Sequence, residues 1–276
     1  MMRKSKGMLR GMLSVLFLCA GICLAPLAGL AAEKTITVFA AASMTESLNK
    51  IAELYKAVAP DVKIVYNFDS SGTLKTQIQE GADCDIFISA GQKQMNQIDV
   101  DADPKVNTEK LDFVLKGTRF DIVSNKVVLI VPKGVNPKGI ADFKDVATDK
   151  VALVALGNSD VPVGQYSEQI YKHLGLWDEL NAKSRISFAS NVKEVLAQVA
   201  AGAVDCGVVY STDAATSQGV EVVAVAPAGS HQPITYPAAI LQCTKEEGAA
   251  KAFVEFLRGP EATAVFEGIG FATPGK

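Results

Sequence analysis

Two serines stand where an apolar, strand-like run gives way to a helix-like run. Ser43 ends the segment Phe39-Ala-Ala-Ala-Ser43, and Ser71 lies within Asp69-Ser-Ser-Gly-Thr73. The first turn of a helix has backbone N–H groups without intrahelical acceptors, and it carries the positive end of the helix dipole. A serine hydroxyl beside those groups adds a further hydrogen-bond donor, so each segment is suited to holding an anion.

Two more helix starts of this kind lie in the second half of the chain. One is Asp160-Val-Pro-Val-Gly164, where the proline suits the first turn of a helix, and the other is Ser190-Asn-Val192, where the asparagine is a suitable N-cap. Any single cap of this type is common in α/β proteins. In open parallel sheets, however, ligands bind beyond the carboxyl ends of strands, where helices begin, so convergence of these starts would form a binding site.

Tyr210 ends the apolar run Gly207-Val-Val-Tyr210. A tyrosine at the end of a buried strand either fills the core or directs its hydroxyl into a cleft. The residues alone leave both interpretations open.

Strand-like and helix-like segments alternate along the chain. Such repeated βα units predict an α/β fold with mostly parallel sheets and helices on both faces. The first series comprises residues 35–40, 46–57, 62–68, 74–80, 86–89 and 93–98, and the second comprises 126–131, 151–156, 165–174, 192–201 and 206–210. A polar, charged stretch at residues 99–110 separates the two series.

The two series also resemble each other. Leu74–Ser89 and Val195–Ser211 each consist of an amphipathic, helix-like run that ends at a glycine, Gly81 or Gly202, followed by a cysteine and a short apolar strand. Two lobes built on a similar plan would explain this likeness. Independent use of a common helix–glycine–strand unit would explain it equally well, because no repeat of domain length can be traced.

The first 32 residues have the layout of a secretory signal peptide. A basic head is followed by an apolar stretch, Met12–Leu27, and by the small-residue tail Ala28-Gly-Leu-Ala-Ala32, which predicts cleavage near Ala31 or Ala32. The apolar stretch is shorter than the ~20 residues of a membrane-spanning helix. A lipoprotein is the alternative, since Cys19 and Cys23 lie here, but bulky residues precede both cysteines. We therefore expect a soluble exported protein.

The charge that remains excludes some classes of partner. Loss of the leader removes four basic residues and no acidic ones, which leaves 23 Lys and Arg against 30 Asp and Glu, a net charge of about −7. An acidic chain without a basic run is poorly suited to nucleic acid or to an anionic membrane. Any anion must therefore be held by local donors against the overall field.

Three cysteines, Cys84, Cys206 and Cys243, follow the leader, and none belongs to a Cys-x-x-Cys pair. We expect them to be small buried hydrophobic residues rather than redox groups. Whether any two of them pair is left open.

The signals of an enzyme or a metal protein are missing from the sequence. His173 and His231 are the only histidines, neither lies in a recognisable catalytic motif, and no Gly-x-Ser-x-Gly is present. Clustered histidines or carboxylates that would suit a metal cation are also lacking. The sequence therefore favours a binding protein without a cofactor over an enzyme.

Seven motifs occur in a specific order over nearly the whole chain after the leader. They are Thr37-Val-Phe-Ala-Ala-Ala-Ser43, Ser70-Ser-Gly-Thr-Leu74, Gly81-Ala-Asp-Cys-Asp-Ile-Phe-Ile-Ser-Ala90, Val161-Pro-Val-Gly-Gln-Tyr166, Leu174-Gly-Leu-Trp-Asp178, Gly207-Val-Val-Tyr-Ser-Thr-Asp-Ala214 and Lys251-Ala-Phe-Val-Glu-Phe-Leu-Arg-Gly-Pro260. This ordered set closely resembles the periplasmic molybdate-binding proteins of ABC importers.

The resemblance implies two α/β lobes, each a mostly parallel sheet flanked by helices, joined by a hinge of crossing strands and closing around a tetrahedral oxyanion. After the signal peptide at 1–32, it implies a discontinuous first lobe, 33–124 plus 235–276, and a second lobe at 125–234. It also implies a periplasmic monomer that delivers molybdate, and tungstate as well, to the membrane permease of an ABC importer.

The resemblance also implies which groups hold the ligand. They are the hydroxyls and backbone N–H groups at Ser43 and Ser71, the backbone N–H groups at Val163 and Val192, and the hydroxyl of Tyr210. Molybdate offers only acceptor oxygens at neutral pH, so a cavity of neutral donors suits it. No direct bond from a side chain to the metal is expected.

Three positions depart from the family pattern and concern selectivity. Asp69 stands where a small residue is usual and Asp160 opens the third loop, so an inward carboxylate at either position would accept the proton of hydrogen phosphate. We expect both to be outward capping or loop residues. Val163 is bulkier than the expected alanine, although only its backbone would be used. A receptor for phosphate or sulfate on the same fold is the alternative function.

Overall fold

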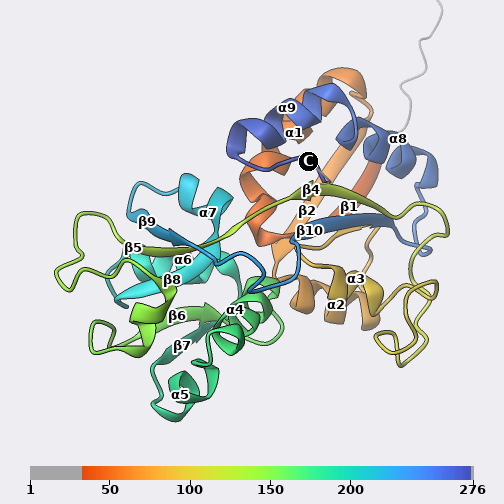
Figure 1. Cartoon of the computed structure of the whole chain (residues 1–276). Coiled ribbons are helices and arrows are strands. Elements are labelled where there is room, and N and C mark those ends of the chain that lie inside the picture. Colours follow the sequence, from red (N-terminus) through yellow and green to blue (C-terminus); the bar gives the residue numbers. More distant parts are fainter. Residues whose placement is uncertain (1–32, 275–276) are drawn as a thin grey trace, which may run out of the picture. The chain divides into compact units, whose positions relative to one another are not determined.

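Two five-stranded sheets, each flanked by helices, make up residues 33–274, the part of the chain that the structure, a computed structural model, describes (Figure 1). The predicted signal peptide at 1–32 lies outside the described residues. The predicted fold class, a two-lobed α/β periplasmic-binding-protein fold, is confirmed, with one sheet at the centre of each lobe.

The first sheet has the strand order β2-β1-β3-β10-β4. Its strands are β1 (Lys34–Ala41), β2 (Val62–Asp69), β3 (Ile86–Ile88), β4 (Phe120–Ser124) and β10 (Thr235–Ile240). β1 pairs in parallel with β2 and β3, whereas β10 runs antiparallel to both β3 and β4. The sheet is thus evenly mixed, because the strand that returns from the second lobe enters it in the opposite direction.

The second sheet repeats this plan with the order β7-β6-β8-β5-β9. Its strands are β5 (Val127–Pro132), β6 (Val154–Gly157), β7 (Ile186–Ala189), β8 (Cys206–Tyr210) and β9 (Val220–Val225). β6 pairs in parallel with β7 and β8, and β5 runs antiparallel to β8 and β9. The two lobes therefore have matching strand orders and strand directions.

Helices cover both faces of the first sheet (Figure 1). A single 3-10 turn at Ala42–Met44 leads into α1, and the remaining helices of this lobe follow β2, β3 and β10. Their bounds are α1 (Thr45–Val58), α2 (Ser71–Gln79), α3 (Gln92–Asn96), α8 (Glu247–Leu257) and α9 (Pro260–Ile269).

Alternation along β1 explains why both faces are covered. Ile36 and Val38 are fully buried in the larger apolar cluster, which includes residues of α1, whereas Phe39 joins a second cluster that includes residues of α2 and α3. Successive side chains of a strand point to opposite faces, so a strand that is apolar on both faces needs a helix layer on each.

The second lobe has a 3-10 helix at Phe143–Ala147 and four α-helices, α4 (Pro162–His173), α5 (Trp177–Ala182), α6 (Val192–Ala200) and α7 (Ser211–Ala215). α6 shows why these segments fold as helices: Val192, Val195 and Val199 recur at helical spacing and are buried. Burial of such an apolar stripe, rather than intrinsic helix propensity, stabilises a helix of this length.

The likeness between residues 74–89 and 195–211 has a structural counterpart. Gly81 and Gly202 lie just beyond the ends of α2 and α6 and have left-handed φ angles of 88° and 68°. β3 and β8 follow these glycines and are the central strands of their sheets. Each glycine forms the equivalent turn of its own lobe, because residues other than glycine adopt a positive φ only at a cost in conformational free energy.

Chain crossings join the lobes at one place. β4 runs into β5 through Asn125 and Lys126, and residues 226–234 lead from β9 back to β10. Ala272 and Ser124 form a β-bridge at this crossing, with nitrogen-to-oxygen distances of 2.7 Å from Ser124 to Ala272 and 3.1 Å from Ala272 to Ser124. The lobe limits of 33–124 plus 235–276 and 125–234 stay a prediction.

The cysteines differ in their exposure. Cys84 and Cys206 are buried as expected, and burial raises the pKa of both thiols. Burial was the wrong prediction for Cys243, which is exposed and whose thiol lies 3.1 Å from the carbonyl oxygen of Cys84. All three are free thiols in the structure.

Candidate functional site

All five predicted ligand-binding residues line one cavity, which lies between the lobes. The space within the cavity is small, about 200 Å³ with the solvent at its mouth included. The predicted residues are Ser43, Ser71, Val163, Val192 and Tyr210, and the others that line it are Ala41, Ala42, Asp69, Ser70, Ala90, Val161 and Pro162. Their role in binding stays a prediction.

The matching topology of the lobes explains why these positions meet. Ser43, Ser71 and Ala90 follow the carboxyl ends of β1, β2 and β3. In the second lobe, Val163 and Val192 follow β6 and β7, and Tyr210 ends β8. Strands in the corresponding places of the two sheets therefore point their carboxyl ends at one cavity, as open α/β sheets do at their binding sites.

The hydroxyl of Ser71 is fixed by the neighbouring strand end. The backbone N–H of Ala90 donates to Ser71 Oγ at 2.9 Å, and Ser71 is fully buried. A serine hydroxyl has one proton to donate, so an oxygen that already accepts from the protein is left with that proton for a ligand. Ser71 is thus a donor toward the cavity.

The helix starts keep particular backbone N–H groups free. At α2, Thr73 N–H donates to the Ser70 hydroxyl at 3.1 Å, whereas Ser71 N–H has no acceptor within residues 33–274. At α6, Glu194 N–H donates to the Asn191 side chain at 3.1 Å, which leaves Val192 N–H at the first helical position. The capping side chains therefore satisfy the third N–H of each helix and leave the first for a ligand.

The start of α4 lacks a capping side chain altogether. Its cap residue is Val161, and Pro162 follows at the first position, where a missing N–H costs nothing. Val163 is fully buried and its N–H is the first one that this helix offers. The N–H groups of α2, α4 and α6 thus supply the cavity with the positive ends of three helix dipoles.

Tyr210 is engaged within the protein. Its hydroxyl donates to the carbonyl oxygen of Ala90, in the other lobe, at 3.3 Å. Burial raises the pKa of this phenol well above its ordinary value, so it is a neutral donor. To donate to a ligand it must give up the bond to Ala90.

Asp69 is the only charged residue among those lining the cavity in the described part of the chain. Its Oδ1 accepts from Ser70 N–H at 2.7 Å and from Asn191 Nδ2 at 3.2 Å, and the second bond crosses between the lobes. Asp160 is exposed and does not line the cavity. The cavity is therefore lined mainly by neutral groups, and the one carboxylate beside it already holds protein donors.

Away from the hinge, four polar contacts among residues 33–274 cross between the lobes, and they show that the structure is closed. Besides those from Tyr210 and Asn191, Gly72 N–H donates to the Asp160 carbonyl at 3.1 Å, and Lys193 Nζ lies 2.8 Å from a carboxylate oxygen of Glu46. A Cβ atom on Gly72 would lie 2.2 Å from the Asp160 carbonyl oxygen, far inside contact distance. Closure thus requires glycine at this position.

We expect Gly72→Ala to prevent full closure and to weaken ligand binding at least tenfold, while each lobe keeps its stability, because the clash is with backbone of the opposite lobe. Gly248→Ala is the matched control, since a Cβ there meets nothing within 4 Å. Calorimetric titration and thermal melting of both variants test this. Unchanged affinity in Gly72→Ala would contradict it.

Lys193 connects the closed lobes to a buried carboxylate. Asp213 of α7 is fully buried, and its Oδ1 lies 3.1 Å from Lys193 Nζ. Burial raises the pKa of Asp213 to about 6, although the nearby ammonium opposes this shift. Burial lowers the pKa of Lys193, but the carboxylates of Asp213 and Glu46 raise it to a value above the ordinary one.

The shifted pKa of Asp213 predicts a pH dependence of stability. Between about pH 4 and pH 6 the folded protein binds a proton that the unfolded chain has released, so this group stabilises the fold at low pH and loses that effect as the pH rises through 6. The unfolding free energy of the wild type minus that of Asp213→Asn should fall by up to about 1.4 kcal/mol per pH unit in this window. Urea unfolding at several pH values tests this; a constant difference would refute it.

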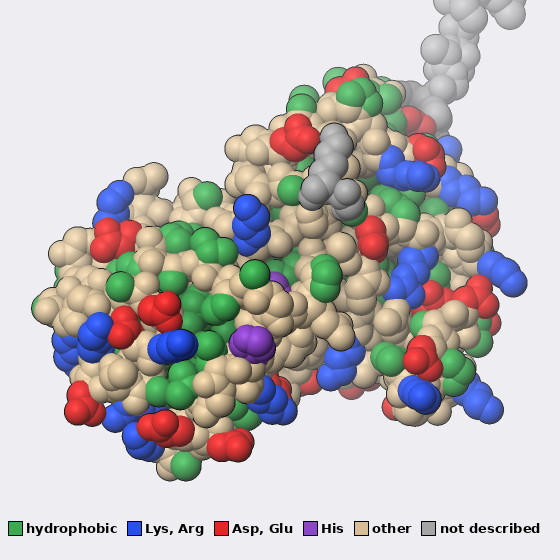
Figure 2. Space-filling view, viewed as in Figure 1, with side chains coloured by type: hydrophobic (Ala, Val, Ile, Leu, Met, Phe, Trp, Pro, Cys, Tyr) green, Lys and Arg blue, Asp and Glu red, His purple; other side chains and the backbone are tan. Residues whose placement is uncertain are grey.

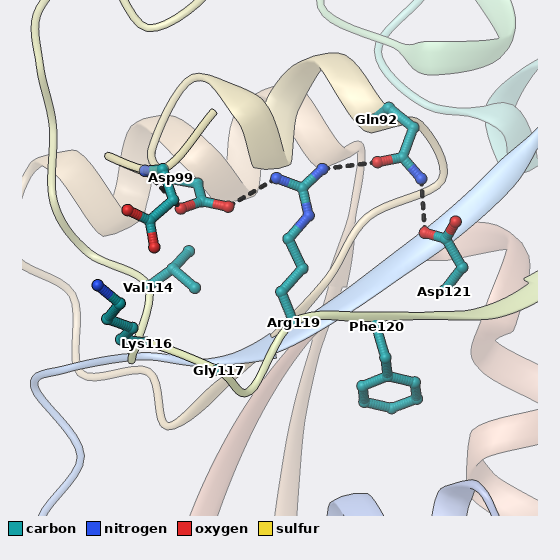
Figure 3. Close-up of a pocket in the computed structure, with 9 residues that line it drawn as sticks. Gln92, Asp99, Val114, Lys116, Gly117, Arg119, Phe120 and Asp121 are labelled. Atoms are coloured by element: carbon teal, nitrogen blue, oxygen red, sulfur yellow. Dashed lines mark hydrogen bonds and ion pairs between the residues drawn. The ribbon is translucent and has the colours of Figure 1, made fainter. Parts of the chain in front are cut away.

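A larger hollow, about 810 Å³ with the solvent at its mouth included, lies elsewhere in the first lobe, and the arginine in its wall is already paired (Figure 3). Arg119 lies 2.7 Å from an oxygen of Asp99 and donates to Gln92 at 2.6 Å, and Gln92 donates to Asp121 at 2.6 Å. A network that satisfies its own donors has little to offer a ligand. The cavity between the lobes is therefore the better candidate.

Comparison with known proteins agrees with the geometry of this cavity. Residues 36–272 match the family described as bacterial extracellular solute-binding protein. The chain belongs to that family. Within it, the chain is 38% identical to the molybdate-binding protein ModA of Haemophilus influenzae over 245 residues, 88% of this chain and 91% of that one.

Two other solute-binding proteins of this kind are similar over most of their length. ModA of Escherichia coli is 38% identical over 249 residues, 88% of this chain and 90% of that one. The solved periplasmic molybdate-binding protein of Azotobacter vinelandii superposes with a TM-score of 0.74 at 28% identity, covering 87% of this chain and 99% of that one.

No helix among the described residues is long and apolar enough to cross a membrane, and those residues hold no cluster of three metal-ligating side chains. Acidic and basic side chains are interspersed over the face shown in Figure 2. Such a surface lacks the basic stripe of a nucleic-acid-binding protein on that face.

Sequence reasoning missed three residues that shape the cavity. Ala90 lines it and bonds both Ser71 and Tyr210, Tyr236 lies 3.0 Å from Ser43 Oγ, and Asn125 donates to Tyr236. Asn125 sits at the point where the chain was expected to leave the first lobe, and a polar residue between two apolar strands was the signal that could have drawn attention to it.

Proposed function

We propose that this solute-binding protein captures molybdate between its lobes and delivers it to the membrane permease of an ABC importer. The observation that carries the proposal is the donor character of the cavity: three helix starts and two buried serines direct protons into it, and its one carboxylate is already bonded to protein donors. The similarity to molybdate-binding proteins over nearly 90% of the chain supports the choice of ligand.

The chemistry of molybdate suits such a cavity. The ion is fully deprotonated at neutral pH, so every oxygen accepts hydrogen bonds and none donates. Hydrogen bonds to a charged group contribute roughly 1.5–3 kcal/mol each, so five such donors can offset the cost of desolvation and give micromolar or tighter binding. Tungstate has nearly the same size and charge and should bind as well.

A receptor for sulfate or phosphate is the alternative. Sulfate is also a proton-free acceptor, and its exclusion would depend on its smaller size. Hydrogen phosphate carries a proton that needs an acceptor, and Asp69 is the only carboxylate beside the cavity in the described chain, with its Oδ1 already accepting two hydrogen bonds. Phosphate binding would have to use the second oxygen, Oδ2, which accepts no hydrogen bond from the described residues.

The proposal extends to the setting in which the protein works. The predicted signal peptide, with cleavage near Ala31 or Ala32, would place the mature chain in the periplasm as a monomer. Its partners would be the oxyanion and the permease, with no nucleic acid, no cofactor and no catalytic step. Reopening of the lobes at the permease would release the ligand.

Calorimetric titration of residues 33–276 with molybdate, tungstate, sulfate and phosphate tests the proposal. We expect micromolar or tighter binding of molybdate and tungstate, and at least tenfold weaker molybdate binding in both Ser43→Ala and Ser71→Ala.

Ser47→Ala is the control for these variants. Ser47 is a buried serine one turn further along the chain, and its hydroxyl donates to the Met44 carbonyl rather than facing the cavity. Tight binding of phosphate without molybdate, or unchanged affinity in both cavity variants, would contradict the proposal.

A further inference from the structure

We propose that Asn125 and Tyr236 orient the hydroxyl of Ser43 so that its proton faces the ligand, and that this chain of hydrogen bonds excludes oxyanions that carry a proton of their own. The inference rests on the proposed function, since it concerns the same cavity. Neither residue lines the cavity, so they act as positioning residues behind Ser43.

The direction of the chain is set by the amide of Asn125, at the crossing between β4 and β5. Its Oδ1 accepts from the backbone N–H of Lys126 at 2.8 Å and from the Ser211 hydroxyl at 3.0 Å. A backbone N–H can only donate, so Oδ1 must be the atom on that side. The Nδ2 group is therefore the one that faces Tyr236.

The two protons of Nδ2 have separate acceptors. One is Thr212 Oγ1 at 2.9 Å, in the second lobe, and the other is the hydroxyl oxygen of Tyr236 at 3.2 Å. Tyr236 thus accepts from Asn125 and has its own proton left to donate. Ser43 Oγ, 193 positions distant in the chain, lies 3.0 Å from the hydroxyl oxygen of Tyr236 and accepts that proton.

Tyr236 is well suited to keep this proton. It is fully buried on β10, and burial raises the pKa of its phenol well above the ordinary value. Its ring packs edge-on against Phe271, with centroids 5.6 Å apart. A rigid, neutral phenol is a donor of fixed direction, unlike a surface hydroxyl that turns to suit its partner.

Ser43 then stands in the same state as Ser71. Each serine oxygen accepts from a protein donor, Tyr236 in one case and Ala90 N–H in the other, which leaves each with its proton and one lone pair, and the proton has no acceptor within the described protein. Molybdate, tungstate and sulfate can use both protons. Hydrogen phosphate could donate its proton to a serine only through that second lone pair, which would turn the serine's own proton away from the ligand and leave it without an acceptor, and an unpaired buried donor costs about 1–3 kcal/mol.

Tyr236→Phe tests this inference, because it removes the donor to Ser43 and keeps the ring. The Ser43 hydroxyl is then no longer held with its proton toward the ligand and can turn to accept. At pH 8, where phosphate is mainly a dianion like molybdate, we expect molybdate affinity to fall about fivefold and the ratio of molybdate to phosphate affinity to fall at least tenfold. Competition titration measures both.

Asn125→Asp gives an independent test, since an acceptor oxygen then faces Tyr236. The phenol should donate to that oxygen instead, and Ser43 should donate to the phenol, so the chain reverses. The added charge repels both dianions alike. The molybdate to phosphate ratio isolates the change in proton direction and should fall at least as far as in Tyr236→Phe.

Two controls separate positioning from packing. Tyr171→Phe alters another fully buried tyrosine, whose hydroxyl has no hydrogen-bond partner among the described residues, and should leave both affinities unchanged. In a double-mutant cycle, Tyr236→Phe should have less than a twofold effect on molybdate affinity once Ser43→Ala is present. An equal effect in both backgrounds, or an unchanged ratio in the single variants, would overturn the inference.

The outcome can be kept apart from that of the proposed function. If the wild type bound sulfate and not molybdate, the molybdate assignment would fall. The same cycle run with sulfate would still decide whether Tyr236 positions Ser43, because sulfate is also a proton-free dianion.

Discussion

Buried hydrogen-bond donors that converge on one cavity set the energetics of lobe closure. Ser43, Ser71 and the first turns of three helices direct donors into a cavity whose lining residues are nearly all buried. Each buried donor without a partner costs about 1–3 kcal/mol. Water can accept hydrogen bonds from these donors only while the lobes are open. A tetrahedral oxyanion supplies acceptors to all of them at once in the closed state. Its binding free energy therefore stabilises the closed arrangement over the open one.

The polar contacts between the lobes outside the cavity are individually weak, which fits this dependence on the ligand. Gly72 with Asp160 and Lys193 with Glu46 fix how the lobes meet, but a partly exposed ion pair contributes at most about 1 kcal/mol. Such contacts specify the geometry of closure without making it permanent. The buried carboxylate of Asp213 holds Lys193 from the other side, so the ammonium is placed before the lobes meet.

Much of the fold and part of the site follow from local sequence. The bounds of β8 were predicted to the residue, because a strand buried on both faces leaves a continuous apolar run in the sequence. α6 was predicted to within one residue of its end, because its buried residues recur at helical spacing. Local signals also named the helix starts that carry Ser71, Val163 and Val192, since a capping residue or a proline marks each, whereas Ser43 lies in a 3-10 turn without such a cap. The even mixture of strand directions was not foreseen, because β10 returns from the second lobe and no local pattern records from which side a strand enters a sheet.

The direction in which a hydroxyl donates is a property of the assembled hinge and lies beyond local sequence. Ser43 follows β1, whereas Tyr236 lies on β10, two strands away in the same sheet. The strand order β1-β3-β10 is what brings the two hydroxyls together. The element that sets the direction is more local: Lys126 N–H fixes the amide of Asn125, its immediate neighbour. Asn125 can therefore be recognised as an orienting residue only once the position of β10, the strand that returns through the hinge, is known. The return crossing supplies the phenol between that amide and the ligand, which makes the hinge part of the recognition chemistry as well as the axis of closure.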